Sequence, residues 1–514
     1  MVEIVVAGAG IAGTLAAYAI RDRLGTDATI TVVSNKDYFE FVPANPWVAA
    51  GWRRFPDVAF PIGPYLGERQ IAFRSTGLTR VHPAANEVEL GDSTRLHYDF
   101  LVLATGPQGA VEEIPGLDPR QGHCHSVLRV EEAVQAHARY REFVTRPGPL
   151  VIGAMPGASV LGPVYELAFL FDSDLRRRGL RAQVPITIIT PEPYPGHLGL
   201  GQGRHQALEQ ALAEANIQWF CNARTTRLAA DSVQFTRHDE QGSVQDTLEV
   251  PSSFCIYWPR FRGIAPLLDG AEGLTDENGL VEVDSSLASR KYPNVFAAGL
   301  CVARAPIEAT PLPIAPPESV FSIEAEVDAI ARNIPARLRG EPLVDAEVRR
   351  VQWIADRGET GAVRLSEPHV PLSNINTLKQ GRWVHSAKLD FEKRFVNRIR
   401  LRPAAPGCAG GELGTVASRL RAGQAVPEQE MQAALTELSV AVPRALFDDL
   451  RALAKTGERE PSELARELLA AALADTRHCL SDAFVAEVER TKSELIAAER
   501  PEARPGAEFE GGAP

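Results

Sequence analysis

The feature that most constrains this chain is the stretch EIVVAGAGIAGTLAAYAI at residues 3–20. An apolar run leads into Gly8, Gly10 and Gly13, which have the spacing G-x-G-x-x-G, and a run of small residues follows. This order predicts a buried parallel strand, a tight turn and a helix. The first glycine allows the turn, the second lets a pyrophosphate approach, and the third lets helix and strand pack closely, with phosphate at the helix N-terminus. The stretch therefore predicts a Rossmann-like dinucleotide-binding domain.

Two later segments also predict a buried strand that is followed by small residues. They are YDFLVLATGP at residues 98–107 and YPNVFAAGL at residues 292–300, in which Thr105, Gly106 and Gly299 leave room for a ligand. Three such segments spread along the chain favour one large cofactor, FAD, over a single nicotinamide nucleotide.

The strand that follows the first helix, ATITVVSN, ends without the acidic residue that binds the ribose of NAD. Ser34 and Asn35 stand at that position. A hydroxyl or an amide can still bond a ribose, so both residues belong to the predicted site although NAD itself is disfavoured.

A second strand, glycine turn and helix are predicted in the middle of the chain, at residues 149–169, and the strand VPITIIT at residues 184–190 closes this unit. Its turn carries Met155 and Pro156, where a nicotinamide site needs open glycine backbone. The unit therefore predicts a second Rossmann-like domain, and its turn disfavours NADH as a ligand.

Composition excludes several classes of function. The 514 residues include 54 Lys and Arg and 66 Asp and Glu, a net charge of −12, which argues against general nucleic-acid binding. Six cysteines are scattered without CxxC or zinc-type spacing, so we expect free thiols and no metal site. The first residues lead straight into a strand without a basic signal-like segment, so we expect a cytoplasmic protein.

Several longer strings carry a resemblance to a known family. They are YFEFVPANPWVAAGWR (38–53), PGASVLGPVYELAF (156–169), EPYPGHLGLG (192–201), KYPNVFAAG (291–299), TPLPIAPPES (310–319) and GRWVHSAKLDFEKRF (381–395). With them the chain resembles the sulfide:quinone oxidoreductases, which are related to flavocytochrome c sulfide dehydrogenase and type-II NADH dehydrogenase, from residue 1 to about residue 402. The resemblance implies FAD as cofactor and quinone as electron acceptor.

The resemblance also implies a pair of catalytic cysteines, and both are missing here. In the family, thiolates hold sulfur as persulfide and pass two electrons through the flavin to quinone, which only sulfur side chains can do. The first cysteine position corresponds to Val160 and the second, in RRVQWIADRGETG, to Trp353. Neither side chain can carry a persulfide, so we expect sulfide oxidation by the family route to be lost.

Other site residues follow from the resemblance. Cys124, in GHCHSV, corresponds to a cysteine that in some relatives bonds covalently to the flavin or handles sulfur; the alternative is a buried free thiol. His197 corresponds to a histidine that assists proton movement; the alternative is a turn residue. Cys301 would form a substitute pair with Cys124 only if the fold brings both to one face.

Glu318 stands where the family has a lysine that stabilises negative charge on reduced flavin, so an ionised glutamate would lower the flavin potential. The predicted catalytic residues are Cys124 and His197. The predicted FAD-binding residues are Gly8, Gly10, Ile11, Ala12, Gly13, Ser34, Asn35, Pro43, Ala44, Thr105, Gly106, Gly299 and Glu318.

The segment 379–402 is basic and amphipathic. It carries eight basic and two acidic residues, a net charge of +6 in an acidic protein. Its apolar positions recur every fourth residue, at Trp383, Ala387, Phe391, Phe395 and Ile399. Such a helix is typical of one that lies in the membrane interface, and the resemblance implies that this region lines the quinone pocket. The alternative is a helix packed on the core with solvated arginines.

Beyond this segment, residues 403–425 form a Pro/Gly/Ala-rich linker. Residues 437–473 read as a strand and two helices, typical of a ribbon-helix-helix unit that dimerises through its strands. Residues 426–514 carry 10 basic and 18 acidic residues, a net charge of −8, so we expect a homo-oligomer contact rather than DNA binding.

The sequence thus predicts an α/β fold with two Rossmann-like domains and two C-terminal additions. The predicted domains are a discontinuous FAD-binding domain (1–110 and 280–340), a second Rossmann-like domain (111–279), a membrane- and quinone-facing region (341–402), the linker (403–425), the ribbon-helix-helix-like domain (426–495) and a disordered tail (496–514).

Three functions are consistent with these residues. The first is an FAD-dependent oxidoreductase on the inner face of the cell membrane that reduces quinone with electrons from a donor other than sulfide. The second is sulfide oxidation by another route, with Cys124 and an external thiol acceptor. The third is a catalytically silent flavin-binding scaffold or regulatory subunit.

Overall fold

The computed structural model describes residues 1–198, 206–268, 272–346, 351–356, 361–366 and 376–400. The chain divides into two compact units, Met1–Pro403 and Ala404–Pro514. The second unit lies outside the described residues, and so do the predicted linker, ribbon-helix-helix-like domain and tail.

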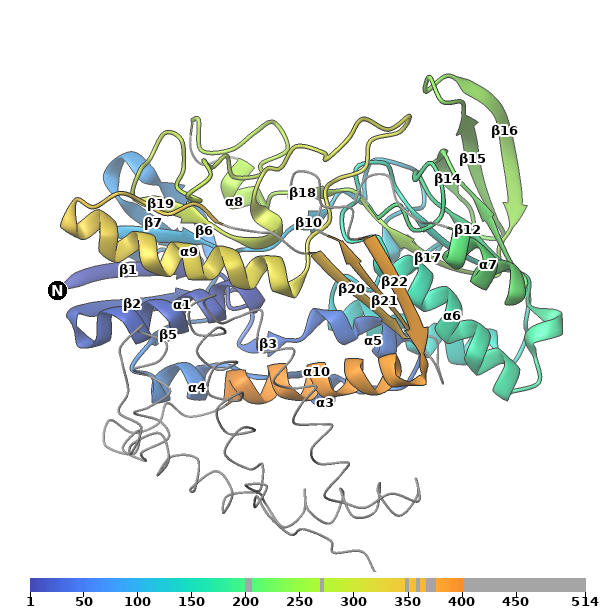
Figure 1. Ribbon diagram of the computed structural model, residues 1–514, viewed down its shortest axis with the longest axis horizontal. Helices are drawn as coiled ribbons and strands as arrows, with labels where there is room; N and C mark the ends of the chain where they lie inside the picture. Colours follow the sequence, from blue (N-terminus) through green and yellow to red (C-terminus); the bar gives the residue numbers. More distant parts are fainter. Residues whose placement is uncertain (199–205, 269–271, 347–350, 357–360, 367–375, 401–514) are drawn as a thin grey trace, which may run out of the picture. The chain divides into compact units, whose positions relative to one another are not determined.

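The first unit contains a parallel five-stranded sheet with the order β19-β9-β1-β2-β5 (Figure 1). Ile4 and Val6 of β1 face one hydrophobic cluster while Val5 and Ala7 face another, so the sheet is buried on both faces, as parallel sheets are. Helices α1 and α9 pack against each other along one face. These elements are β1 (Val2–Ala7), α1 (Ile11–Leu24), β2 (Ala28–Val33), β5 (Ala72–Arg74), β9 (Phe100–Leu103), β19 (Val295–Ala297) and α9 (Val320–Arg339).

A second parallel sheet has the order β13-β12-β11-β17. An antiparallel sheet, β14-β15-β16, is inserted in the chain between β13 and β17. The elements of this part are α5 (Val130–Phe143), β11 (Leu150–Ala154), α6 (Gly162–Arg177), β12 (Ile186–Ile189), α7 (Gln206–Glu214), β13 (Ile217–Phe220), β14 (Ala223–Leu228), β15 (Ser232–His238), β16 (Val244–Pro251) and β17 (Phe254–Trp258). The two parallel sheets confirm the predicted α/β class and its two Rossmann-like units.

Smaller elements complete the described chain, including a three-stranded antiparallel sheet, β20-β21-β22, that lies beside α6 and α10 (Figure 1). They are β3 (Tyr38–Glu40), α2 (Asn45–Ala49), α3 (Phe55–Val58), β4 (Ala59–Pro61), α4 (Gly63–Glu68), β6 (Leu78–His82), β7 (Glu87–Leu90), β8 (Arg95–His97), β10 (Gln108–Gly109), β18 (Phe261–Arg262), α8 (Ala265–Leu268), β20 (Val351–Asp356), β21 (Gly361–Ser366), β22 (Asn376–Gly381) and α10 (Arg382–Arg400).

Helix α10 has the predicted amphipathic pattern, but its stripe packs on the protein. Phe395 and Ile399 are buried, and the rings of Phe391 and Phe395 contact Phe41 at centroid distances of 5.9 and 5.2 Å. The Tyr18 hydroxyl donates to the carbonyl of Ile399. The core-packed alternative therefore describes Phe391, Phe395 and Ile399, while the side chain of Trp383 lies outside the described residues. The periodicity of a helix does not reveal what covers its apolar face. Within the described residues, no helix combines the length and apolarity that crossing a bilayer requires.

Candidate functional site

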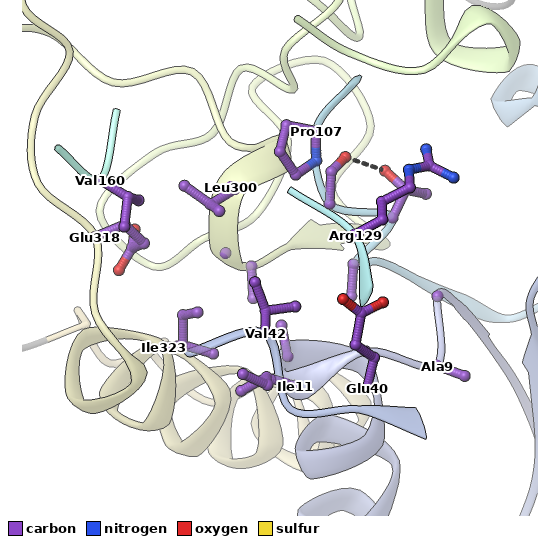
Figure 2. Close-up of a pocket in the computed structure, with 18 of the residues that line it drawn as sticks. Ala9, Ile11, Glu40, Val42, Pro107, Arg129, Val160, Leu300, Glu318 and Ile323 are labelled. Atoms are coloured by element: carbon purple, nitrogen blue, oxygen red, sulfur yellow. Dashed lines mark hydrogen bonds between the residues drawn. The ribbon is translucent and has the colours of Figure 1, made fainter. Parts of the chain in front are cut away.

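A cavity of about 630 Å³ opens where the strands of the first sheet end. Its wall includes the residues that directly follow β1, β2, β9 and β19, and it extends to α9 and α10. Ligands of open parallel sheets bind at this carboxyl edge. Figure 2 shows the lining side chains, with Glu40 and Arg129 toward one end and Val160 and Glu318 toward the other.

The glycine turn forms a phosphate cradle in this wall. Gly8 has φ +122°, and a Cβ there would lie 2.1 Å from the carbonyl oxygen of Ala104. A Cβ on Gly10 would meet no atom within 4 Å, so the backbone is open to a ligand at this point. Helix α1 begins at Ile11 without a side-chain cap, which leaves its first N–H groups available to an anion. The turn therefore fits the pyrophosphate of FAD.

Most predicted FAD-binding residues line the cavity. Gly13 does not, because it packs against the Gly8 carbonyl, and Ala44 is buried away from the wall. The predicted residues in the wall are Gly8, Gly10, Ile11, Ala12, Ser34, Asn35, Pro43, Thr105, Gly106, Gly299 and Glu318.

Sequence reasoning missed a polar group at the Glu40 end. The Glu40 carboxylate accepts bonds from Val130 N (2.7 Å), Asn45 Nδ2 (2.8 Å) and Lys36 Nζ (3.0 Å). Lys36 and Arg129 also line the cavity and bring positive charge to it. The string YFEFVPAN contained Glu40, but nothing in its pattern identified a carboxylate that bonds backbone 90 residues away.

Val160, where the sequence resemblance places the first catalytic cysteine of the family, lies in the cavity wall. Its φ is +58°, a left-handed conformation that a β-branched residue rarely adopts. Neighbouring bonds hold this turn: Ser159 Oγ donates to Pro316 O (2.9 Å), and Trp258 Nε1 donates to Ser159 O (3.0 Å). The cavity wall therefore holds a left-handed backbone at a residue whose side chain offers no nucleophile.

Trp353, where the resemblance places the second cysteine, lies on β20 opposite Arg364 of β21. Strand β20 contacts α6 and α10, two helices that contribute residues to the cavity wall. Its side chain lies outside the described residues.

The predicted cysteines do not face the cavity. The Cys124 thiol is buried and donates to Leu117 O (3.0 Å), and burial raises its pKa to about 12. The Cys301 thiol donates to Leu103 O, and burial raises its pKa to about 11. Cys124 belongs to the cluster under the second sheet and Cys301 to a cluster under the first, so the fold does not pair them. None of the four described cysteines lines the cavity.

His197, the other predicted catalytic residue, is also buried outside the cavity wall. Its Nε2 lies 2.6 Å from Glu308 Oε1, and its ring meets Tyr194 edge to face. This contact ties the loop after β12 of the second sheet to the segment between β19 of the first sheet and α9.

The second glycine turn is closed by protein. Gly157 N donates to Pro313 O (2.6 Å), and Ala315 N donates to Ala158 O (3.3 Å), so residues 311–316 lie across the turn. At the end of β12, Glu192 stands where a Rossmann domain binds ribose, but it is buried and accepts bonds from Tyr165 Oη and from Thr190 Oγ1 (2.7 Å). Both groups that a nicotinamide nucleotide would need are thus used within the protein.

A buried ion pair lines the wall near α10. Lys388 Nζ donates to Glu166 Oε1, and both side chains are almost fully buried. Burial raises the pKa of Glu166, and Lys388 opposes this effect. Phe391 and Phe321, with ring centroids 5.4 Å apart, lie in the same wall. The cavity therefore offers a cation beside an aromatic surface at this end.

Comparisons with known proteins agree with this geometry. A family model described as "Pyridine nucleotide-disulphide oxidoreductase" matches residues 2–314. The "Sulfide-quinone reductase" of Aquifex aeolicus (strain VF5) is 34% identical over 407 residues, which is 79% of this chain and 92% of that protein. The relatives of this chain also include "External alternative NAD(P)H-ubiquinone oxidoreductase B2, mitochondrial" of Arabidopsis thaliana, which is 27% identical over 143 residues, 26% of this chain and 23% of that protein.

Solved structures give the same result. The sulfide:quinone oxidoreductase from A. aeolicus matches with a TM-score of 0.74 at 34% identity, over 79% of this chain and 93% of that one. NDH2 from Plasmodium falciparum in complex with NADH matches with a TM-score of 0.60 at 14% identity, over 77% of this chain and 94% of that one. The second match reflects the fold alone.

Proposed function

Because the chain belongs to the sulfide:quinone oxidoreductase family and is an FAD-dependent oxidoreductase, we propose that it passes electrons from a donor other than sulfide to a quinone at the membrane surface. FAD would be held by the glycine turn, by the turns after β9 and β19, and by Lys36 and Arg129. Bound there, it supplies reversible two-electron transfer.

The observation that carries the loss of sulfide oxidation is Val160 in the cavity wall. A valine side chain offers no nucleophile and no site for sulfur exchange. The described cysteines, which lie outside the wall, do not replace it. The placement of Cys124 against Leu117 O also favours FAD held without a covalent bond; acid precipitation would then release the flavin.

The closed second turn supports a donor other than NADH. Residues 311–316 cover the backbone that a pyrophosphate would approach, and the Glu192 carboxylate is used by Tyr165 and Thr190. A nicotinamide nucleotide would have to break these contacts in order to bind as it does to a Rossmann turn.

Quinone as acceptor is supported by the α10 end of the cavity. A quinone needs a flat apolar surface and a donor for the oxygen that gains negative charge. Phe391 and Phe321 offer the surface, and Lys388 offers the charge-assisted donor. We propose that Lys388 holds the reduced oxygen and that Glu166 keeps the ammonium in place.

Stopped-flow reoxidation tests this role. Glu166→Gln/Lys388→Met removes the pair without leaving an unpaired buried charge. We expect dithionite-reduced holoenzyme of this variant to be reoxidised by a soluble quinone about tenfold more slowly or worse, given the roughly 1.5–3 kcal/mol of a hydrogen bond to a charged group. The double variant should react with ferricyanide, which needs no such donor, at the wild-type rate. As a second control, Lys393 is an exposed lysine of the same helix, and the Lys393→Met variant should react with quinone at the wild-type rate. Equal quinone rates in the double variant and wild type would contradict the proposal.

Membrane contact is supported by the outer face of α10 rather than by its stripe. Lys393, Arg394 and Arg398 are exposed there, and a basic surface is attracted to anionic lipid headgroups. We expect Lys393→Glu/Arg394→Glu to lose binding to vesicles that contain anionic lipid, while Arg224→Glu/Arg227→Glu on β14 keeps it. Equal binding by the two variants would contradict a docking role for this face.

A further inference from the structure

Two carboxylates and one guanidinium meet at the cavity wall. Glu318 Oε2 lies 3.1 Å from Arg304 Nε, and Glu326 Oε1 lies 2.5 Å from Arg304 Nη2. The Glu318 and Glu326 side chains are 4% and 1% exposed, and Arg304 is 27% exposed. Arg304 thus bridges Glu318 and Glu326, which we call the carboxyl pair.

The carboxyl pair is connected directly to the FAD cavity. Glu318 is itself a lining residue, at the same end as Val160 (Figure 2). Glu326 Oε2 accepts a hydrogen bond of 2.8 Å from the backbone N–H of Gly299, which also lines the cavity. A change of charge in the cavity therefore acts on both carboxyls at short range.

Few other ionisable groups face the carboxyl pair. The Cys301 thiol is near Arg304 and Glu326 but is bonded to Leu103 O. Glu318 also accepts from the hydroxyl of Ser322, which carries no charge. The Glu166–Lys388 pair also lines the cavity, but it balances its own charge. The charges of the group are thus set by Arg304 and the two carboxyls.

One guanidinium cannot neutralise two buried carboxylates. With both ionised, the group would carry a net charge of −1 almost out of contact with water, which is costly. Holding one proton removes that charge. Burial, followed by the charge of Glu318, raises the pKa of Glu326 to about 7, although Arg304 opposes the shift. Near neutral pH the group is therefore balanced between holding the proton and releasing it.

We propose that the carboxyl pair binds one proton from solvent when electrons enter the FAD cavity and releases it when they leave. The proton comes from water at the exposed edge of Arg304 and forms one O–H bond on Glu318 or Glu326. The two electrons stay on the flavin; they come from dithionite in the experiment below. This inference goes beyond the proposed function, because it requires FAD in the cavity but no particular donor or acceptor.

The pH dependence of the flavin potential tests the proposal. If reduction by two electrons takes up one extra proton, the equilibrium constant for flavin reduction falls by up to a further tenfold for each unit that the pH rises. For a two-electron couple this corresponds to an extra decrease of about 30 mV in the reduction potential per pH unit. We expect this extra slope at and above pH 7 in the wild-type holoenzyme and its absence in Glu326→Gln. Glu324→Gln on the same helix, whose carboxylate pairs with Arg398 instead, should keep the wild-type slope.

A second measurement, made on the wild type, decides the proposal even if a variant binds FAD poorly. The infrared difference spectrum between oxidised and dithionite-reduced wild type should gain a protonated carboxyl band, and Glu318→Gln or Glu326→Gln should remove it. Equal slopes in wild type and Glu326→Gln, or no carboxyl band on reduction, would overturn the proposal. Neither measurement uses quinone, so both can test this proposal even if the protein has no quinone reductase activity.

Discussion

The hydroxyl of Ser159 donates a hydrogen bond of 2.9 Å to the carbonyl oxygen of Pro316, and this contact holds Val160 in the cavity wall. The bond joins the glycine turn of the second sheet to the segment that leads into Glu318. The same segment covers the second glycine turn, because Gly157 N donates to Pro313 O.

The left-handed backbone of Val160 makes an unusual stability prediction. Its conformation costs about 1–2 kcal/mol in a residue with a Cβ, and glycine removes that cost. We expect Val160→Gly to lose less than about 1 kcal/mol of unfolding free energy, because strain relief offsets the lost apolar contact. Val164→Gly, at a buried helical position, should lose about 3 kcal/mol or more. Urea unfolding compares them, and equal losses would contradict the strain.

The phosphate cradle predicts a selective loss of flavin. A Cβ at Gly8 would overlap the Ala104 carbonyl and would need a φ that alanine avoids, so Gly8→Ala displaces the turn. We expect its flavin content per protein, read from visible absorbance, to fall tenfold or more. Gly67→Ala, where the Cβ meets nothing within 4 Å, serves as control and should retain wild-type flavin. Full flavin in Gly8→Ala would mean that FAD is held elsewhere.

The Glu166–Lys388 pair predicts a non-additive effect on stability. Lys388→Met leaves Glu166 buried without its cation, which costs about 3–5 kcal/mol. Adding Glu166→Gln removes the stranded charge, so the double variant should recover much of that loss. Additive losses in a denaturant double-mutant cycle would show that the two side chains are not coupled.

The raised pKa of Glu326 predicts the sign of a pH effect. A carboxyl that titrates near 7 when folded and near 4.5 when unfolded holds its proton more tightly in the folded state. Its stabilising contribution is therefore complete below pH 4.5 and is lost as the pH rises through 7. As the pH rises from 5 to 8, the unfolding free energy of Glu326→Gln should increase by about 2–3 kcal/mol relative to that of the wild type. A pH-independent difference in unfolding free energy would contradict the shift.

The sequence predicted the parts of the site that depend on local backbone. Gly8 and Gly10 were identifiable because strand, turn and helix are adjacent in the chain, and Gly299 because small residues follow a strand. The partners Arg304 and Glu326 were not, since their contact depends on tertiary packing and has no motif. The pattern of α10 predicts an apolar face but not what covers that face, and the packing of Phe395 and Ile399 on the protein is a tertiary contact.

Anaerobic titration of the purified holoenzyme with sulfide tests most directly whether sulfide is a donor; the visible absorbance of the flavin is followed, with NADH in a parallel cuvette. We expect that neither reagent bleaches the flavin, while dithionite does and a soluble quinone then restores the colour. Rapid bleaching by sulfide that quinone reverses would mean that the family reaction persists without cysteines at positions 160 and 353, and would contradict the proposed function.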